Sequence, residues 1–272
     1  MPITADCHLH TTFSGDGASS MEDMIKEGIR LGLTHMCFTE HNDLDFPVTE
    51  DSPAGYFEVN TDSYLYELLL LREKYASQIK VNFGIELGLQ PHLLRPNSVY
   101  AKSYDFDFVI GSSHICNGKD PYCPDFYEGR SDEEAYREYF SSIIENLRKF
   151  TNFDVYGHLD YVVRYGRERD KDYSYEKYRD LIDTILELLL ENGKGLELNT
   201  SGLKYKLKDM HPCTAILNKY RRLGGEIITI GSDAHSCSRI AADFDRAAEV
   251  LKECGFKYYT IFEKRLPEFK KL

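Results

Sequence analysis

The chain alternates between two kinds of segment, and this alternation constrains its fold more than any other feature. Short runs with a β-strand character lie at 3–10, 34–41, 80–89, 105–114, 153–160, 195–201 and 226–235. Longer runs with apolar residues at three- and four-residue spacing lie at 19–32, 62–77, 131–150, 175–195, 214–225 and 241–255. These patterns predict strands and amphipathic helices respectively. Repeated βα units form a parallel sheet with right-handed crossovers, so we expect an α/β protein.

The number of these units favours a closed barrel over an open sheet, because about seven of them occur in one chain. No Pro/Gly-rich linker divides the sequence, so residues 1–272 are expected to form a single domain, a (β/α) barrel with seven or eight strands. The run at 256–263 could supply one more strand or an edge segment. The residues SDEE at 131–134 form a capping-box pattern, which predicts the start of a helix.

The composition argues against several classes of protein. Hydrophobic residues make up 42% of the chain, enough for a substantial core, yet no stretch approaches the roughly 18 apolar residues that span a bilayer. The net charge of -12, with no basic run before 263–272, argues against nucleic acid or an anionic membrane as the main partner. The first ten residues show no signal-peptide pattern and the cysteines form no C-x-x-C pair, so we expect a cytoplasmic protein with reduced thiols.

Side chains that can bind metals lie at the end of nearly every predicted strand. The segment DCHLH at 6–10 places His8 and His10 on one face, because side chains alternate along a strand. This segment alone could be a polar edge strand, and a lone histidine at a strand end is more often structural. However, six of the nine histidines close a predicted strand, and carboxylates accompany them. The set comprises His8, His10, Asp16, His41, Glu86, His114, His158, Asp233 and His235.

These side chains are predicted to meet at one end of the barrel, because the carboxyl ends of barrel strands converge on the face that carries the active site. Imidazole nitrogens and carboxylate oxygens suit zinc, manganese or iron. The set is too large for one tetrahedral site, which implies a cluster of two or three divalent ions. Such clusters catalyse phosphoester hydrolysis, because the ions activate water and stabilise charge on the transferring phosphoryl group.

The order and spacing of these motifs resemble the PHP (polymerase and histidinol phosphatase) superfamily. The resemblance rests on HLH (8–10), TEH (39–41), GIE (84–86), SSH (112–114), GH (157–158) and SDAH (232–235). It covers nearly the whole chain and implies a distorted (β/α)7 TIM-like barrel with a trinuclear centre. By motif, it implies one metal on His8, His10, Glu86 and Asp233, a second on Asp16, His41 and His235, and a third on Glu86, His114 and His158. Many relatives have histidine at position 16, so the harder Asp16 could shift the preference toward manganese or iron.

Within the superfamily, the chain is similar to the stand-alone histidinol-phosphate phosphatases of histidine biosynthesis. The similar features are the long loop at 42–60, the Tyr- and Pro-containing loop at 115–130 and GHLDYVVRYG at 157–166. This similarity implies hydrolysis of the small phosphate monoester L-histidinol phosphate to L-histidinol and phosphate. The metal ligands determine the chemistry, whereas the loops select the leaving group, so the substrate depends on these loops.

Cationic side chains near the strand ends are candidates for binding the phosphate, because a phosphate dianion favours fork-shaped donors. Arg164 follows the fifth predicted strand by a few residues and is expected to act in both substrate binding and catalysis. Arg130, Arg167 and Lys204 are further candidates, although most surface cations are simply solvated.

Acidic residues close to the motifs are candidates for supporting roles. Asp160 shares a predicted strand face with His158, so we expect it to assist catalysis by supporting that ligand; Asp6 is placed in the same way relative to His8. Either carboxylate could instead hydrogen-bond to backbone. The acidic loop at 43–58 could face a cationic substrate or be an ordinary solvated loop.

Other functions stay open on the sequence alone. A protein-tyrosine phosphatase of the same superfamily, or another phosphoesterase for small molecules or nucleotides, would use the same ligands with a different rim. A nuclease is disfavoured by the acidic net charge, since nucleic-acid binding requires a basic surface. A regulatory barrel that binds metal without turnover is disfavoured by the complete ligand set.

Overall fold

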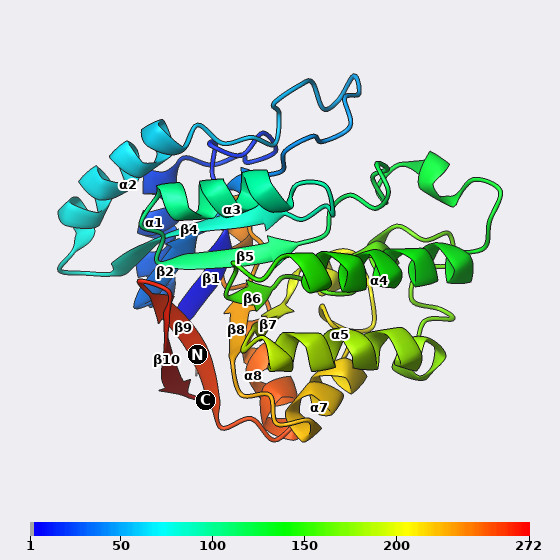
Figure 1. The fold of residues 1–272 in the computed structure, drawn as a ribbon. Coiled ribbons are helices and arrows are strands. Elements are labelled where there is room, and N and C mark those ends of the chain that lie inside the picture. The colour runs from blue at the N-terminus through cyan, green and yellow to red at the C-terminus, as the bar shows by residue number, and fades with distance from the viewer. Residues whose placement is uncertain (1–2) are drawn as a thin grey trace.

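The computed structural model describes residues 3–272, in which a parallel sheet curves into a nearly closed barrel (Figure 1). The barrel strands are β1 (Ala5–Leu9), β2 (His35–Phe38), β3 (His41–Asn42), β4 (Lys80–Gly88), β5 (Phe108–Ser112), β6 (Val155–Tyr156), β7 (Gly195–Asn199) and β8 (Ile228–Gly231). Neighbours follow the order β1-β2-β4-β5-β6-β7-β8, and every pair is parallel. Because β2 and β3 pair with successive parts of β4, the eight strands occupy seven barrel positions. The predicted barrel class is confirmed.

The barrel closes where its first strand meets its last. Ala234, which follows β8, forms a parallel bridge with Leu9 of β1. The amide of His10 donates to the carbonyl of Ala234 at 3.0 Å, and the amide of Asp233 donates to the carbonyl of His8 at 2.9 Å. These bonds bring the HLH and SDAH motifs, from opposite ends of the sequence, into direct contact.

Helices surround the sheet (Figure 1). They are α1 (Met21–Leu31), α2 (Thr61–Tyr75), α3 (Leu94–Ser103), α4 (Asp132–Lys149), α5 (Arg179–Glu191), α6 (Ser201–Lys204), α7 (Thr214–Arg222) and α8 (Phe244–Glu253). The predicted capping box is confirmed at α4, where Ser131 and Glu134 each accept a hydrogen bond from the other's backbone amide. No helix among residues 3–272 is long and apolar enough to cross a membrane.

Helix α3 is not indicated by the spacing of apolar residues, and a buried polar side chain attaches it to the sheet. Pro96 lies in its first turn, where proline is tolerated because the missing N–H would have no helical acceptor. Its buried positions are Asn97 and Ala101, and the Asn97 amide donates to the carbonyl of Gly88 at 3.0 Å. The helix is therefore anchored to the end of β4 by a polar side chain.

The C-terminal residues form a separate antiparallel hairpin of β9 (Tyr258–Glu263) and β10 (Leu266–Lys271). Asn82 near the start of β4 donates to the carbonyl of Phe262 at 2.6 Å, and the amide of Lys264 donates to Asp107, just before β5, at 3.1 Å. The hairpin therefore packs against the amino ends of the strands. The predicted strand at 256–263 exists, but it lies outside the barrel at the end away from the strands' carboxyl ends.

Candidate metal centre

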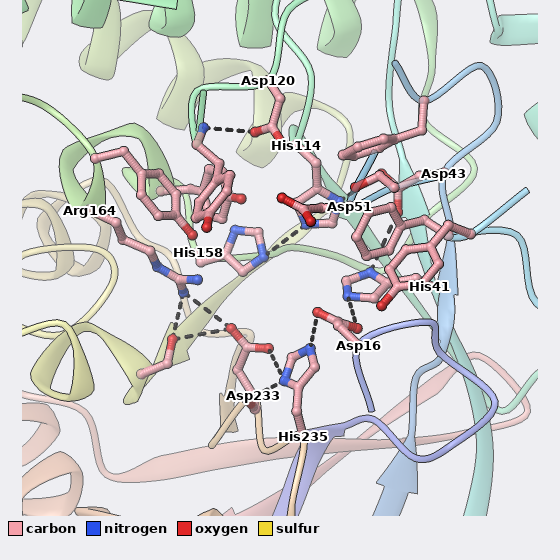
Figure 2. A pocket seen from close by; sticks show the side chains of 18 of the residues that line it. Asp16, His41, Asp43, Asp51, His114, Asp120, His158, Arg164, Asp233 and His235 are labelled. Atoms are coloured by element: carbon pink, nitrogen blue, oxygen red, sulfur yellow. Dashed lines mark hydrogen bonds and ion pairs between the residues drawn. The ribbon is translucent and has the colours of Figure 1, made fainter. Parts of the chain in front are cut away.

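All nine predicted metal-binding side chains lie at the carboxyl end of the barrel, and six of them line one cavity of about 360 Å³ (Figure 2). Beneath the cavity lie three that are completely buried: His8, His10 and Glu86. Those that line the cavity are Asp16, His41, His114, His158, Asp233 and His235.

Glu86 lies at the centre of this arrangement. Its Oε1 lies 2.9 Å from Nε2 of His158 and 3.3 Å from Nε2 of His114. Its Oε2 lies within 3.5 Å of ring nitrogens of three further histidines, His8, His10 and His41. Burial would raise the pKa of Glu86, but the charges on His8 and His114 hold it well below its ordinary value. One ionised carboxylate thus contacts five imidazoles, as a bridging metal ligand would.

The ligand atoms fall into closely spaced groups. Within each group the atoms lie within 4.8 Å of one another; the groups are His8–His10–Asp233, His10–His41–His235, His8–Glu86–His158 and His41–Glu86–His114. The first group contains three of the four residues that the superfamily resemblance implies for one metal. Asp16 adjoins the second, with Oδ2 3.1 Å from Nε2 of His235 and Oδ1 3.8 Å from Nε2 of His41. Burial would raise the pKa of Asp16, but its hydrogen bond to His235 and the nearby charge of His41 lower it.

The polar atoms of this cluster fit divalent cations. Glu86 Oε2 and His41 Nδ1 are buried and have no hydrogen-bond partner within the described part of the chain. Nε2 of His8 and Nε2 of His10 face each other at 3.0 Å. Buried polar groups without partners are unfavourable, and a cation coordinated by these lone pairs removes that cost. Nitrogen and carboxylate donors of this kind suit zinc, manganese or iron.

Glu197 of β7 supports the centre through hydrogen bonds to two of the metal-ligand candidates, although it was not among the residues predicted from the sequence. The His8 ring donates from Nδ1 to Glu197 Oε1 at 2.6 Å, and the His158 amide donates to Oε2 at 2.9 Å. Burial would lower the pKa of His8, but Glu197 and Glu86 hold it well above its ordinary value. Gly231 of β8 makes room, since a Cβ there would lie 2.3 Å from the His8 Cβ and 2.4 Å from Glu197 Oε1. A carboxylate in the middle of a buried strand is the only sequence signal for this role.

Asp43 supports a second part of the centre. Nδ1 of His114 donates to Asp43 Oδ1 at 2.7 Å, and Asp43 Oδ2 lies 3.4 Å from Nδ1 of His41. Burial would lower the pKa of His114, but the carboxylates of Asp43 and Glu86 raise it to about 10. The first residue of the predicted acidic loop is therefore buried against metal-ligand candidates. It is neither solvated nor free to meet a substrate.

Asp6 binds backbone amides, which was the alternative role considered for it. It accepts from the amides of Ser232 at 3.0 Å, Ala241 at 2.9 Å and His8 at 3.4 Å. Burial raises its pKa to about 6, against the effect of these bonds. Asp6 thus joins β1 to the segment that follows β8, and among its described partners there is no imidazole.

The expectation that Asp160 supports His158 is wrong. Strand β6 ends at Tyr156, and the chain enters a 3₁₀ turn at Tyr161–Arg164, so strand alternation does not extend to Asp160. Asp160 instead accepts from Nδ1 of His211 at 2.5 Å and from the amide of Cys213 at 3.0 Å. Its contacts lead to Arg164 through His211.

Arg164 lines the cavity and is almost completely buried. Its Nε donates to Nε2 of His211 at 3.0 Å, and its Nη2 donates to Ser201 Oγ at 2.5 Å and to Asp233 Oδ2 at 3.1 Å. Burial would lower its pKa, but the negative charge of Asp233 raises it, so the guanidinium stays charged. The guanidinium carbon lies 4.8 and 4.7 Å from the ring centroids of Tyr161 and Tyr205.

The other cationic candidates differ in position. Lys204 lines the same cavity as Arg164. Arg130 forms an ion pair with Glu138 of α4 and donates to the carbonyl of Phe126. Arg167 donates to the carbonyl of Tyr127 at 2.6 Å. Because neither of these arginines lines the cavity, the expectation that Arg130 binds substrate is not supported by its position.

Comparison with known proteins identifies the family. The PHP domain family model matches residues 6–201. A probable histidinol-phosphatase from Clostridium acetobutylicum is 34% identical over 266 residues, covering 97% of this chain and 98% of the relative. The chain belongs to the PHP domain family. Histidinol-phosphatase from Lactococcus lactis is 32% identical to this PHP protein over 94% of its length and 93% of the relative.

A solved structure resembles this PHP protein over nearly all of both chains. It is the crystal structure of histidinol phosphate phosphatase from Lactococcus lactis in complex with zinc, L-histidinol and phosphate. Its TM-score is 0.88 at 31% sequence identity, and the match covers 97% of this chain and 98% of the other. The distorted barrel expected from the PHP resemblance is therefore confirmed.

Proposed function

We propose that this PHP protein is a metal-dependent phosphomonoester hydrolase that converts L-histidinol phosphate and water to L-histidinol and phosphate. The observation that carries the proposal is a single cavity faced by six metal-ligand candidates and by Arg164. The relatives from Clostridium acetobutylicum and Lactococcus lactis support this choice of substrate, because they match over nearly their full lengths. We also infer a cytoplasmic location, with a small molecule rather than nucleic acid or membrane as the partner.

The proposal includes a cluster of two or three divalent ions, zinc, manganese or iron, held at the carboxyl end of the barrel. When bound, such ions supply a nucleophile from water and stabilise the charge that develops on the phosphoryl group. The side chains assigned to hold them are His8, His10, Asp16, His41, Glu86, His114, His158, Asp233 and His235.

Arg164 is the residue we assign to the phosphate. Its Nη2 is held by Ser201 and Asp233, and its Nε by His211, whereas Nη1 donates to no acceptor among residues 3–272. The free Nη1 can donate to a phosphate oxygen in the cavity, and the charge-assisted bond would strengthen as negative charge grows. Lys204 adds positive charge on the same cavity wall. This local charge opposes the overall net charge of -12.

His211 and Asp160 act on Arg164 as positioning residues in this proposal. Nε2 of His211 accepts from Arg164 while Nδ1 donates to Asp160, so the ring is a neutral tautomer with a fixed orientation. Burial lowers the pKa of His211, which favours this neutral form. The guanidinium is therefore oriented before substrate arrives, which reduces the reorganisation needed in the transition state.

A phosphate-release assay tests the proposed function. Purified protein reconstituted with Zn²⁺ or Mn²⁺ is expected to hydrolyse L-histidinol phosphate far faster than phenyl phosphate or a phosphotyrosine peptide. Activity should disappear with a chelator and return when metal is restored. A flat substrate profile would contradict the assigned substrate, and preference for the phosphotyrosine peptide would favour a protein phosphatase.

A further inference from the structure

One wall of the cavity is used by neither the metal-ligand candidates nor Arg164. It is formed by the loops at 43–58 and 115–130, and its residues include Phe46, Asp51, Phe57, Asp120 and Tyr122. Figure 2 shows Asp51 and Asp120 on the side of the cavity away from Asp233 and His235. We refer to Phe46, Asp51, Asp120 and Tyr122 as the acidic wall.

The acidic wall carries carboxylates without a cation, unlike the rest of the cavity. Three lining carboxylates are paired: Asp16 with His235, Asp43 with His114 and Asp233 with Arg164. Asp51 and Asp120 form no ion pair with any described residue of the chain. Asp51 is exposed, whereas Asp120 is half-buried. A partly buried carboxylate without a counter-charge is unfavourable, so Asp120 favours a ligand that brings a positive charge, and Asp51 adds negative charge beside it.

Asp120 is the better placed of the two carboxylates. It is half-buried, and its Oδ1 accepts from the amide of Tyr122 at 2.8 Å, which fixes the side chain against the loop. Burial raises its pKa to about 6. The Asp120 carboxylate accepts only this one hydrogen bond from residues 3–272. Its remaining lone pairs can therefore accept from a donor in the cavity.

Aromatic rings flank these carboxylates. The rings of Phe46 and Phe57 lie 4.4 Å apart between centroids, and Tyr122 meets Tyr165 edge to face at 5.4 Å. Faces of this kind attract flat or cationic groups. The wall therefore combines negative charge with aromatic surface in the same cavity as the site assigned to phosphate.

We propose that the acidic wall is the leaving-group subsite, where Asp120 and Asp51 bind the ammonium group of an amino-alcohol phosphate and the aromatic rings contact its imidazole. The identity of the alcohol rests on the proposed function, whereas its positive charge follows from the wall itself. An ester with a neutral alcohol would leave both carboxylates without a cation, so the wall selects among esters that the metal centre could hydrolyse equally.

Substitution of the wall carboxylates tests the subsite. The measured quantity is kcat/KM for L-histidinol phosphate divided by kcat/KM for phenyl phosphate, with metal-reconstituted full-length protein. In Asp120→Asn this ratio should fall about tenfold or more, as expected for loss of one charge-assisted hydrogen bond, with a smaller fall in Asp51→Asn. Asp120→Glu should recover part of the ratio because it restores the charge.

Asp125→Asn is the matched control. Asp125 lies in the same loop but outside the cavity, where it pairs with Lys119 at 3.5 Å, so its substitution should leave the ratio unchanged. Metal content and thermal unfolding of each variant show that the centre and fold are intact. An unchanged ratio in both Asp120→Asn and Asp51→Asn would overturn the proposal.

A second pair of substrates separates this proposal from the proposed function. If the unsubstituted protein does not prefer L-histidinol phosphate, the assigned substrate is wrong, and the subsite is then tested with ethanolamine phosphate against ethyl phosphate. A fall of that ratio in Asp120→Asn would support a cation subsite for another amino alcohol. A ratio that does not respond would reject the subsite as well.

Discussion

The floor of the cavity, formed by His8, His10 and Glu86, differs from the acidic wall in almost every physical respect. The floor residues lie on or beside barrel strands, are completely buried and contact one another within 3.5 Å. Asp120 and Tyr122 of the wall lie on a loop and are partly or largely exposed. The floor is fixed by strand geometry, whereas the wall depends on loop conformation.

This difference separates two roles within one site: the floor supports hydrolysis of every ester, and the wall selects among esters. The floor can hold its groups in one geometry because strands, closing hydrogen bonds and buried carboxylates all determine the positions of the same side chains. The wall can change with a loop and leave the floor intact, because loops tolerate substitution better than buried strands. We therefore expect substitutions in the floor to affect every substrate and substitutions in the wall to affect some of them.

The largest effect is expected from Glu86→Ala. Removing this carboxylate leaves five imidazoles without their shared partner, so metal content and activity should fall together. We expect kcat/KM to fall by roughly a thousandfold or more for every phosphate ester, since the charge stabilisation supplied by the ions is lost. Phosphate release and metal analysis on the same sample measure both quantities.

The control for Glu86 is Glu73→Ala, an exposed position on α2 that is outside the cavity. It should retain metal and activity. Full activity in Glu86→Ala would contradict its central role in the floor.

The next largest effect is expected from Arg164→Met. This variant removes the guanidinium that we assign to the phosphate, and Asp233 loses its ion pair with Arg164. Loss of charge-assisted bonds should lower kcat/KM by about a hundredfold for all esters, whatever the leaving group. Arg130→Met is the matched comparison, because Arg130 lies outside the cavity and pairs with Glu138. Equal losses in the two variants would contradict the assignment of Arg164 to the phosphate.

The sequence predicts the barrel and the positions of the floor residues because both depend on the regular geometry of strands. Strand periodicity and the convergence of strand ends are local rules, so DCHLH and SDAH can be assigned to one face before their contact is known. Only three-dimensional packing shows that Glu86 contacts five histidines from four separate motifs. Its burial then follows from the parallel pairing of β4 with β3 and β5.

The same rules fail where side chains leave the strands. Asp160 fails because β6 ends early and the following turn breaks the alternation of faces. The position of Arg164 soon after a predicted strand favours it over Arg130, but only tertiary structure shows that Arg130 pairs with Glu138 and that Arg164 lines the cavity. Glu197 has no local signal for its role, because the metal-ligand candidates that it supports, His8 and His158, come from other parts of the chain.

A smaller effect is expected from Glu197→Gln. This variant weakens the support of the ligand candidate His8 but removes no ligand candidate. Glutamine has the same shape but only one acceptor oxygen, so it cannot accept from both His8 Nδ1 and the His158 amide. Metal affinity should fall by about 10- to 100-fold, as is typical when a ligand loses its supporting carboxylate. Competition with a chelator measures it, with Glu187→Gln on the exposed side of α5 as the control. Unchanged affinity would mean that Glu197 has only a structural role.

The smallest effect is a change in proton release on metal binding, which distinguishes the metal-ligand candidates from the acidic wall in solution. The pKa of His114 in the metal-free protein is about 10, so the ring carries its proton at neutral pH. A metal ion binds only the neutral ring, and loading must therefore release this proton, so metal affinity should rise with pH across the neutral range and fall in acid.

Asp43→Asn tests this because it removes the carboxylate that most favours the protonated His114. The His114 pKa should fall, and up to about one proton fewer should be released per protein in weakly buffered solution containing an indicator dye. Asp51→Asn should leave the proton count unchanged, because Asp51 forms no ion pair with a described residue. If the two variants release equal numbers of protons, Asp43 does not control the charge of His114, and the electrostatic distinction between the metal-ligand candidates and the acidic wall fails.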